Sequence, residues 1–202
     1  MNYLAHAYLS FNNPGILTGN MISDYVKGKK KFDYPSVIQN GIALHRAIDT
    51  FTDAHEATKE AKEIFRPAYR LYSGAFVDVV YDHFLAGDSN EFTEDSLHNF
   101  SLQVYKTLDG YTAHFPEKFA NSFPYMKQHN WLYNYRTRWG IEKSLGGVVR
   151  RATYLTESET AFGLFEQHYQ LLQHCYRHFW ADLKPFAKQQ FELLQNNTAG
   201  NT

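Results

Sequence analysis

The spacing of apolar residues is helical along nearly the whole chain, and no alternating run of β-branched residues predicts a strand. A first long helical pattern begins at Pro14 and is expected to stop at Gly28. A second is expected to start with Ser36 as its N-cap and to run to about Asp53. The chain therefore reads as all-α.

The remaining helices follow from the same periodicity. They are expected over 56–74 with a bend near Pro67, over 74–85, after a cap at Thr93, within 116–135 and 140–155, and from about 156 to 195. No repeat or change of composition marks a domain boundary. The pattern predicts one all-α domain, a helical bundle over residues 1–195, followed by a disordered polar tail over 196–202.

One apolar segment contains charged residues that need an explanation. Residues 76–85 read FVDVVYDHFL, so Asp78, Asp82 and His83 lie among apolar and aromatic neighbours. Asp78 and Asp82 are four residues apart and share one helix face. A buried carboxylate is costly unless a cation or a hydrogen-bond donor satisfies it. Either a metal lies beside these acids, or they form internal salt bridges with Arg66 or Arg70.

A second polar stripe runs along the helix that precedes it. His45, Asp49 and Asp53 recur at i, i+4 and i+8, at the margin of an apolar face. Such a row suits a half-buried metal site, because the cation offsets the desolvation of the carboxylates. The alternative is a solvated polar edge with pairs such as Arg46–Asp49 and Arg46–Thr50.

Two isolated polar residues extend this set, Asp24 in GNMISDYVKG and His6 in YLAHAYL. Imidazole and carboxylate ligands without a thiolate suit Mn²⁺, Mg²⁺ or Fe²⁺ better than a structural zinc site. Such a metal would polarise a phosphoryl oxygen and lower the pKa of a water molecule. Arg46, Arg66 and Arg70 could hold phosphate oxygens. The residues favour metal-assisted hydrolysis of a phosphoester.

Composition narrows the class of protein. The chain has 202 residues, of which 44% are hydrophobic and 20% charged, as expected for a globular domain. Its single cysteine, Cys175, excludes an intramolecular disulfide and is expected to be a small core residue. The N-terminus lacks the features of a signal peptide, and no segment is long and apolar enough for a membrane span. A cytoplasmic location is predicted.

Two basic clusters stand out against a formal net charge of −1. The first contains Lys27, Lys29, Lys30 and Lys31, and the second contains Arg150 and Arg151. Neither cluster is interleaved with aromatic residues that could read bases, so nucleic acid is not an expected partner. Beside a phosphoester site, the clusters would attract a polyanionic substrate or an acidic protein.

The chain resembles the acyl carrier protein phosphodiesterase family in the order and spacing of five stretches: MNYLAHAYLS, TGNMISDYVKGK, GIALHRAIDTFTDAH, FRPAYRLYSGAFVDVVYDHFLA and WLYNYRTRWGIEKSLGGVVRRA. The likeness covers about residues 1–155. It implies an all-helical fold related to the HD-domain phosphohydrolases. It also implies removal of the 4′-phosphopantetheine arm from holo-acyl carrier protein, with dependence on a divalent metal, usually Mn²⁺.

The resemblance also assigns roles to residues. It implies metal ligation by Asp24, His45, Asp49, Asp78, Asp82 and His83, and a catalytic role for Asp24, His45, Arg46 and His83, with His6 as a further member. It makes the basic residues Lys27, Lys29, Lys30, Lys31, Arg150 and Arg151 the binding surface for the acidic carrier protein. One departure is that HD enzymes carry an adjacent His-Asp pair, whereas the order here is Asp82-His83. The HD ligand scheme therefore cannot be transferred residue by residue.

The predicted function is metal-dependent hydrolysis of the phosphodiester between phosphopantetheine and the carrier serine. Two alternatives stand beside it. The same metal site could act on a nucleotide or another small phosphoester, or the chain could be a non-catalytic helical module that binds an acidic protein and pairs its buried acids with arginines. The sequence makes no prediction of the oligomeric state.

Overall fold

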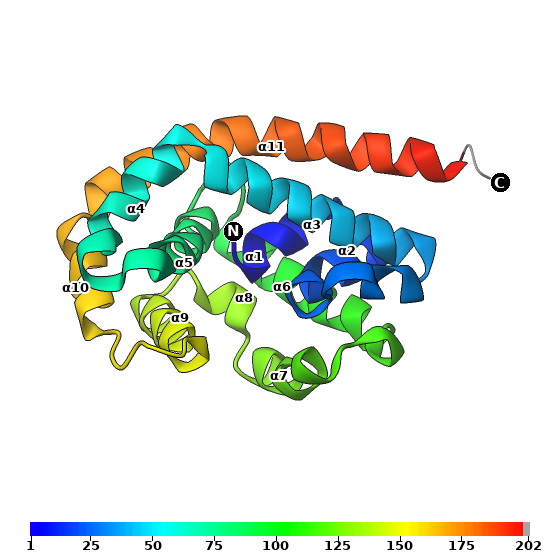
Figure 1. Ribbon diagram of the computed structural model, residues 1–202, viewed down its shortest axis with the longest axis horizontal. Coiled ribbons are helices and arrows are strands. Elements are labelled where there is room, and N and C mark those ends of the chain that lie inside the picture. The colour runs from blue at the N-terminus through cyan, green and yellow to red at the C-terminus, as the bar shows by residue number, and fades with distance from the viewer. Residues whose placement is uncertain (200–202) are drawn as a thin grey trace.

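The computed structural model describes residues 1–199, and this part of the chain is helical without any strand (Figure 1). The α-helices are α1 (Tyr3–Tyr8), α2 (Pro14–Ile22), α3 (Ser36–Ala54), α4 (Glu56–Tyr69), α5 (Ser73–Ala86), α6 (Glu94–Asp109), α7 (Glu117–Gln128), α8 (Trp131–Asn134), α9 (Arg138–Arg151), α10 (Glu159–Gln167) and α11 (Tyr169–Ala199). The 3-10 helices are η1 (Ser23–Tyr25), η2 (Gly28–Asp33), η3 (Arg70–Tyr72) and η4 (Thr112–His114). The predicted all-α fold is confirmed.

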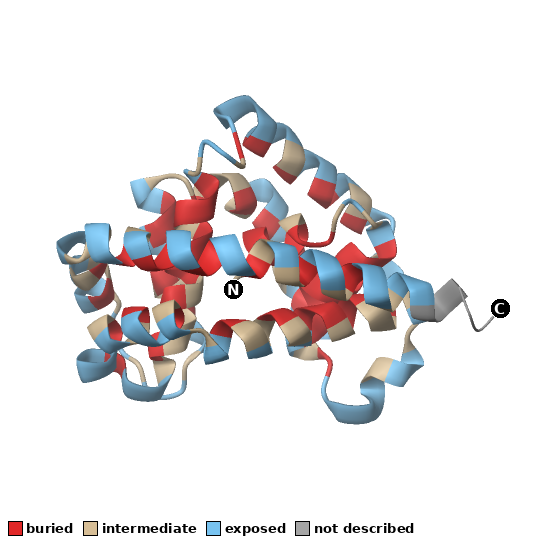
Figure 2. Ribbon diagram, turned by 90° about the horizontal axis from the view of Figure 1, so that it is seen from above, coloured by how far each residue is buried: buried red, intermediate tan, exposed pale blue. Residues whose placement is uncertain are grey.

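The helices form one domain around a single core. Figure 1 shows α11 running along one side of the molecule, where it contacts α3, α4 and α5. Leu4 of α1, Ile48 of α3, Val80 of α5 and Phe179 of α11 are fully buried, and they connect these helices through the centre. Figure 2 shows buried positions on the inner faces of the helices and exposed positions on the outer faces. The core therefore holds α1 and α3 in fixed positions against α5.

Several helix ends differ from the expectations. Thr93 caps α6 as predicted and forms a capping box with Ser96. Ser36, by contrast, is the first residue of α3, and Pro35 takes the N-cap position. The reason is that the carbonyl of Pro35 already accepts the backbone N–H of Gln39 at 3.0 Å, which is the first hydrogen bond of the helix. The pattern that was expected to continue to Gly28 ends as an α-helix at Ile22 and continues into the 3-10 turn η1.

The C-terminal helix also runs further than predicted. The tail was expected to begin at residue 196, but α11 continues to Ala199. Residues 200–202 of the predicted tail lie outside the described residues. Within the described part of the chain, no helix combines the length and the apolar character that crossing a membrane requires.

Helices α2 and α3 cross at unusually short range because glycines meet at the crossing. A Cβ atom on Gly19 would lie 2.1 Å from the carbonyl oxygen of Ile38, and one on Gly41 would lie 2.2 Å from that of Ile16. No other residue fits at either position without moving a backbone. The crossing places the carbonyl of Asn20, near the end of α2, against the side chain of His45 on α3.

Candidate metal centre

Four side chains from three elements meet at one place, and we call them the His/Asp cluster: His6, Asp24, His45 and Asp49. Nε2 of His45 lies 3.0 Å from Oδ2 of Asp49 and 3.2 Å from Oδ1 of Asp24. Nε2 of His6 lies 3.2 Å from Oδ1 of Asp49. The two imidazole rings are stacked, with centroids 3.9 Å apart. Ligand atoms of His6, His45 and Asp49 lie within 4.8 Å of one another, a spacing that could hold a metal ion.

The backbone of α2 fixes the orientation of His45. Nδ1 of His45 lies 2.8 Å from the carbonyl oxygen of Asn20. A carbonyl can only accept, so Nδ1 carries the hydrogen and Nε2 faces the carboxylates of Asp24 and Asp49. A lone pair and two carboxylates repel one another unless a proton or a metal cation lies between them. The arrangement therefore requires a positive charge at Nε2.

His6 is buried with no ring nitrogen in an aligned hydrogen bond within the described residues. Its contact with Asp49 has the distance of an ion pair without the alignment of a hydrogen bond. A buried polar atom without a partner is costly, and such atoms are rare in folded proteins. A bound cation would satisfy the ring, so the donor set and this unpartnered nitrogen both fit a divalent metal.

The protonation states follow from these contacts. Burial and the neighbouring His45 lower the pKa of His6 to about 4, so His6 is neutral and able to act as a ligand at neutral pH. Burial opposes the charged form of His45, but hydrogen bonds to Asp24 and Asp49 raise the pKa of His45 to about 9. The hydrogen bond with His45 lowers the pKa of Asp24, and contacts with both histidines hold the pKa of Asp49 well below its usual range despite burial. Both carboxylates are ionised at neutral pH.

Asp78 and Asp82 lie behind the cluster and hold the start of α1. Oδ1 of Asp78 accepts a hydrogen bond from the N-terminal ammonium of Met1 at 2.9 Å, and this ammonium also lies 3.7 Å from Oδ1 of Asp49. The fully buried carboxylate of Asp82 accepts the backbone N–H groups of Leu4 at 2.7 Å and Ala5 at 3.2 Å. Burial raises the pKa of Asp82 to about 7 and raises that of Asp78 as well. These acids anchor the helix that carries His6.

The internal salt bridges considered for these acids do not form. Arg66 pairs instead with Glu63 at 2.9 Å, and among the described residues neither Asp78 nor Asp82 forms an ion pair with Arg66 or Arg70. The side-chain pairs of Arg46 that belonged to the alternative of a solvated edge do not form in the described part of the chain either. Asp49 contacts the histidines, and the hydroxyl of Thr50 donates to the Arg46 carbonyl. Asp49 is therefore part of the His/Asp cluster and not of a solvated edge.

Two other predicted site residues lie outside the cluster. His83 donates from Nδ1 to the carbonyl of Tyr135 at 2.8 Å, and its Nε2 lies 3.4 Å from the hydroxyl of Tyr169. Since adjacent residues on a helix point about 100° apart, His83 cannot share the direction of Asp82. Nη2 of Arg46 donates to the carbonyl of Val26 at 2.9 Å and ties α3 to the segment after Asp24.

The predicted basic residues occupy two surfaces. Lys27, Lys29, Lys30 and Lys31, which we call the lysine loop, lie at and within η2, directly after η1; the first three are exposed and Lys31 is half-buried. Arg150 and Arg151 are exposed at the C-terminal end of α9. Asp53, the last acid of the predicted stripe, pairs with Lys62 at 2.7 Å outside the cluster.

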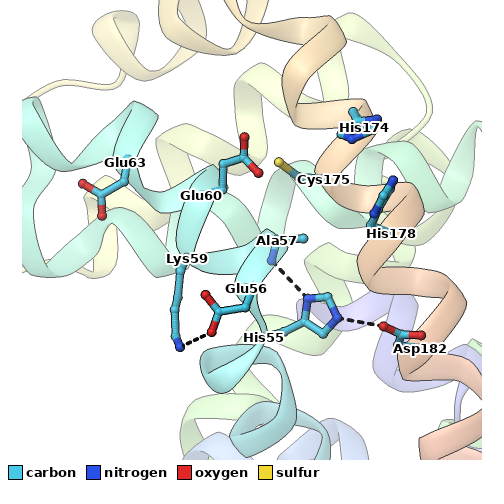
Figure 3. A pocket seen from close by; sticks show the side chains of 10 residues that line it. All are labelled: His55, Glu56, Ala57, Lys59, Glu60, Glu63, His174, Cys175, His178 and Asp182. Carbon is cyan, nitrogen blue, oxygen red and sulfur yellow. Dashed lines mark hydrogen bonds and ion pairs between the residues drawn. The ribbon is translucent and has the colours of Figure 1, made fainter.

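Another group of metal-type side chains lines a separate pocket between α4 and α11 (Figure 3). His55 already uses both ring nitrogens there. Nδ1 accepts the backbone N–H of Ala57, which caps α4, and Nε2 lies 3.1 Å from Oδ2 of Asp182. Figure 3 shows His174 and His178 on α11 apart from this pair, and the geometry of a metal site recurs nowhere outside His6, His45 and Asp49 in the described chain. Burial raises the pKa of Cys175 to about 11, so this thiol is not a nucleophile.

Sequence reasoning missed two members of the site. The Asn20 carbonyl orients His45, and the only sequence signal was a polar residue within the apolar run of α2. The ammonium of Met1 lies between Asp49 and Asp78, and no side-chain pattern indicates a backbone group in such a position.

Comparison with known proteins places this chain among named relatives. The family model for acyl carrier protein phosphodiesterase matches residues 1–183. A protein of that name from Klebsiella pneumoniae subsp. pneumoniae is 32% identical over 197 residues, which cover 97% of this chain and 98% of the relative. One from Yersinia pestis is 32% identical over 89% of this chain and 94% of the relative, and one from Photorhabdus laumondii is 31% identical over 84% and 86%. No solved structure matches the chain, so the relation to HD-domain enzymes stays a prediction. The chain belongs to the acyl carrier protein phosphodiesterase family.

Proposed function

We propose that this chain hydrolyses the phosphodiester that joins 4′-phosphopantetheine to the serine of holo-acyl carrier protein and leaves the apo protein. The name shared by its curated relatives supports this substrate. The observation that carries the proposal is the His/Asp cluster, in which two histidines and Asp49 present ligand atoms within 4.8 Å of one another. The cytoplasmic location stays a prediction.

We propose that His6, His45 and Asp49 hold a divalent metal and that Asp24 completes the ligand set. Oxygen and imidazole donors without a thiolate favour Mn²⁺, with Mg²⁺ and Fe²⁺ as alternatives. The bound metal would polarise a phosphoryl oxygen and lower the pKa of a water molecule. In this assignment Asp78 and Asp82 support α1, whereas the sequence predicted that they were ligands. His83 has no part in the assigned ligand set.

The side chains around the metal have separate tasks. Asp24 is the more exposed of the two acids in the cluster, so its carboxylate would hold the metal from the open side of the site, where a substrate enters. His45 is held by Asn20 and keeps Nε2 directed at the metal position. Arg46 donates one N–H to the carbonyl of Val26, and its other guanidinium N–H groups form no hydrogen bond or ion pair among the described residues. Those groups are our candidates for binding the phosphate.

The reaction can be tested by the intact mass of holo-acyl carrier protein after incubation with this protein and Mn²⁺, with a chelator in the control. We expect the loss of one phosphopantetheine mass only when metal is present. No change in mass with folded, metal-loaded protein would contradict the proposed substrate, and the hydrolysis of small phosphoesters would then be measured. Binding of the carrier without metal uptake or hydrolysis would indicate the non-catalytic alternative.

A further inference from the structure

A cavity of about 620 Å³ is lined in part by Tyr25, the residue after Asp24, and we call it the aromatic cavity. Figure 1 shows α8 between α7 and α9, the helices that supply most of its walls. Its volume is in the range of pockets that bind small organic ligands. Its lining consists of Asn2, Tyr3, Tyr25, Lys118, Ser122, Tyr125, His129, Trp131, Asn134, Tyr135, Trp139, Gly140, Lys143, Ser144, Gly147, Arg150 and Arg151.

Aromatic rings are present throughout this lining, including at positions open to solvent. Tyr125 on α7 and Trp139 on α9 are among the exposed large hydrophobic residues of the chain. Trp131 and Tyr135 lie between them in sequence and are more buried. Exposed aromatic side chains around one cavity are typical of a binding site, because folding alone favours the burial of such side chains away from water.

The charge of the cavity is entirely of one sign. Lys118, Lys143, Arg150 and Arg151 line it, and the lining contains no aspartate or glutamate. None of these four cations forms an ion pair with an acid of the described chain. Four cations in a lining without acids, in a protein of net charge −1, indicate an anionic ligand.

One end of the cavity lies next to the segment that carries Asp24. The hydroxyl groups of Tyr3 and Tyr25 share a hydrogen bond of 2.8 Å and both belong to the lining. Tyr25 directly follows Asp24, which contacts His45. Arg151 and Tyr3 line the same cavity. A phosphate at this end of the cavity would therefore lie near Arg151 and the segment that carries Asp24.

We propose that the aromatic cavity binds the 4′-phosphopantetheine arm of the substrate, an inference that rests on the proposed function. The phosphate lies at the end near Arg151 and the segment that carries Asp24. The uncharged chain of the arm, with its two amides and its dimethyl carbon, extends along the tyrosine and tryptophan rings. The cavity suits this occupant better than a surface of the carrier protein, because it is concave and of small-molecule size, whereas the lysine loop is an exposed basic surface elsewhere.

The three tryptophans of the chain provide a direct test of binding without catalysis. Trp131 and Trp139 line the cavity, whereas Trp180 is buried on α11 and donates to Glu91. We expect free 4′-phosphopantetheine to change the fluorescence of a Trp180→Phe variant saturably. We expect no change in the matched Trp131→Phe/Trp139→Phe variant. Inorganic phosphate should give no tryptophan signal, and pantetheine without phosphate should bind more weakly.

A second variant closes the cavity in the otherwise unchanged protein. A Cβ on Gly147 would meet only a guanidinium nitrogen of Arg150, at the ordinary distance of 3.5 Å, so Gly147→Leu fits on α9 and extends into the cavity. We expect the affinity for 4′-phosphopantetheine to fall at least about tenfold. The matched control is Gly163→Leu on α10, where a Cβ meets open space and the residue does not line this cavity. The affinity of the Gly163→Leu variant for 4′-phosphopantetheine should not change.

The outcomes separate this inference from the proposed function. If holo-acyl carrier protein loses its arm in the mass assay but the free arm neither changes the fluorescence nor responds to Gly147→Leu, the cavity assignment is overturned and the function stands. If the arm binds here and no hydrolysis occurs, the function fails and the cavity assignment stands. A fluorescence change with apo-acyl carrier protein, which lacks the arm, but not with the arm itself would assign the cavity to the carrier protein and overturn the inference.

Discussion

At the scale of single residues, Asp49 connects both histidines of the His/Asp cluster. One of its oxygens lies near His45 and the other near His6, and the Met1 ammonium lies 3.7 Å away from the second. Contacts with both histidines hold the pKa of Asp49 well below its usual range although burial opposes ionisation, so the carboxylate stays charged. Asp49 therefore supplies a permanent negative charge between the two histidines, where a metal cation would bind.

The first prediction concerns this charge. Asp49→Asn keeps the shape of the side chain but removes its negative charge, so we expect the affinity for Mn²⁺ to fall by at least about 100-fold, since even the partners of metal ligands often contribute tenfold or more. Titration calorimetry measures this affinity. The matched control is Asp53→Asn, one turn further along α3, where the carboxylate pairs only with Lys62. Equal affinities in the two variants would remove Asp49 from the metal site.

The same scale shows how far the site could be predicted from sequence. His45 and Asp49 could be paired because both lie on one regular helix, where a spacing of four residues places them together. Asp82 could be recognised as a buried acid that needed a partner, but its partners are backbone N–H groups at the start of α1. Those contacts depend on how α1 docks against α5. No local pattern encodes that docking, and for this reason Asp82 resembled a ligand.

At the scale of helices, the crossing of α2 and α3 controls the geometry of the metal centre. Gly19 and Gly41 allow the two backbones to touch, and the Asn20 carbonyl then orients His45. The periodicity predicted both helices, but it did not predict their contact, because a glycine in a helical run indicates no particular neighbour. The distance between the helices decides whether Nε2 of His45 reaches Asp24.

The second prediction tests this crossing. In Gly41→Ala the added methyl would lie 2.2 Å from the carbonyl oxygen of Ile16, so the helices must separate. We expect a loss of about 1–3 kcal/mol in the free energy of unfolding, as for other overpacked sites, and weaker Mn²⁺ binding. Urea denaturation and calorimetry measure the two effects. Gly163→Ala, where a Cβ meets open space, serves as control and should be neutral or stabilising. Unchanged metal affinity in a destabilised Gly41→Ala protein would separate the crossing from the site.

A third prediction concerns the attachment of α1 to α11 through Glu91. Its carboxylate accepts hydrogen bonds from Trp180 at 2.9 Å and from Tyr8 and Lys184, each at 2.6 Å. Burial opposes its ionisation, but these donors lower the pKa of Glu91 below its ordinary value of 4.5. Glu91→Gln loses the charge that all three donors contact, so we expect the free energy of unfolding at neutral pH to fall by about 2–3 kcal/mol.

The pH dependence of this effect has a definite sign. Because the folded-state pKa of Glu91 is lowered, its stabilising contribution is complete above 4.5 and is lost as the pH falls through the folded-state value. The difference in unfolding free energy between the wild type and Glu91→Gln should therefore shrink in acid, as measured by urea denaturation at several pH values. Glu192→Gln, at an exposed position of α11, should change stability by less than about 0.5 kcal/mol. A difference that is independent of pH would show that the charge of Glu91 is not the cause.

At the scale of the whole molecule, two basic surfaces are linked to the segment around Asp24 although the net charge is −1. The lysine loop follows this segment along the chain, and Arg150 and Arg151 share the aromatic cavity with Tyr25. Both basic surfaces are therefore linked to the segment that carries Asp24. An acidic protein attracted to the loop would be held next to the segment that carries Asp24, so the charge distribution agrees with the proposed substrate.

The last prediction follows from this distribution. Replacing Lys29, Lys30 and Lys31 with glutamate should raise KM for holo-acyl carrier protein at low salt and leave kcat nearly unchanged, because these lysines lie outside the cluster and affect the encounter with the carrier. Steady-state kinetics over a range of salt concentrations should show that the difference from the wild type narrows as salt screens the charges. Reversal of three other exposed lysines, Lys59, Lys106 and Lys188, gives the same net charge and should affect KM much less. An equal rise in both variants would mean that net charge, and not the lysine loop, attracts the carrier, whereas an unchanged KM in the loop variant would exclude the loop as its docking surface.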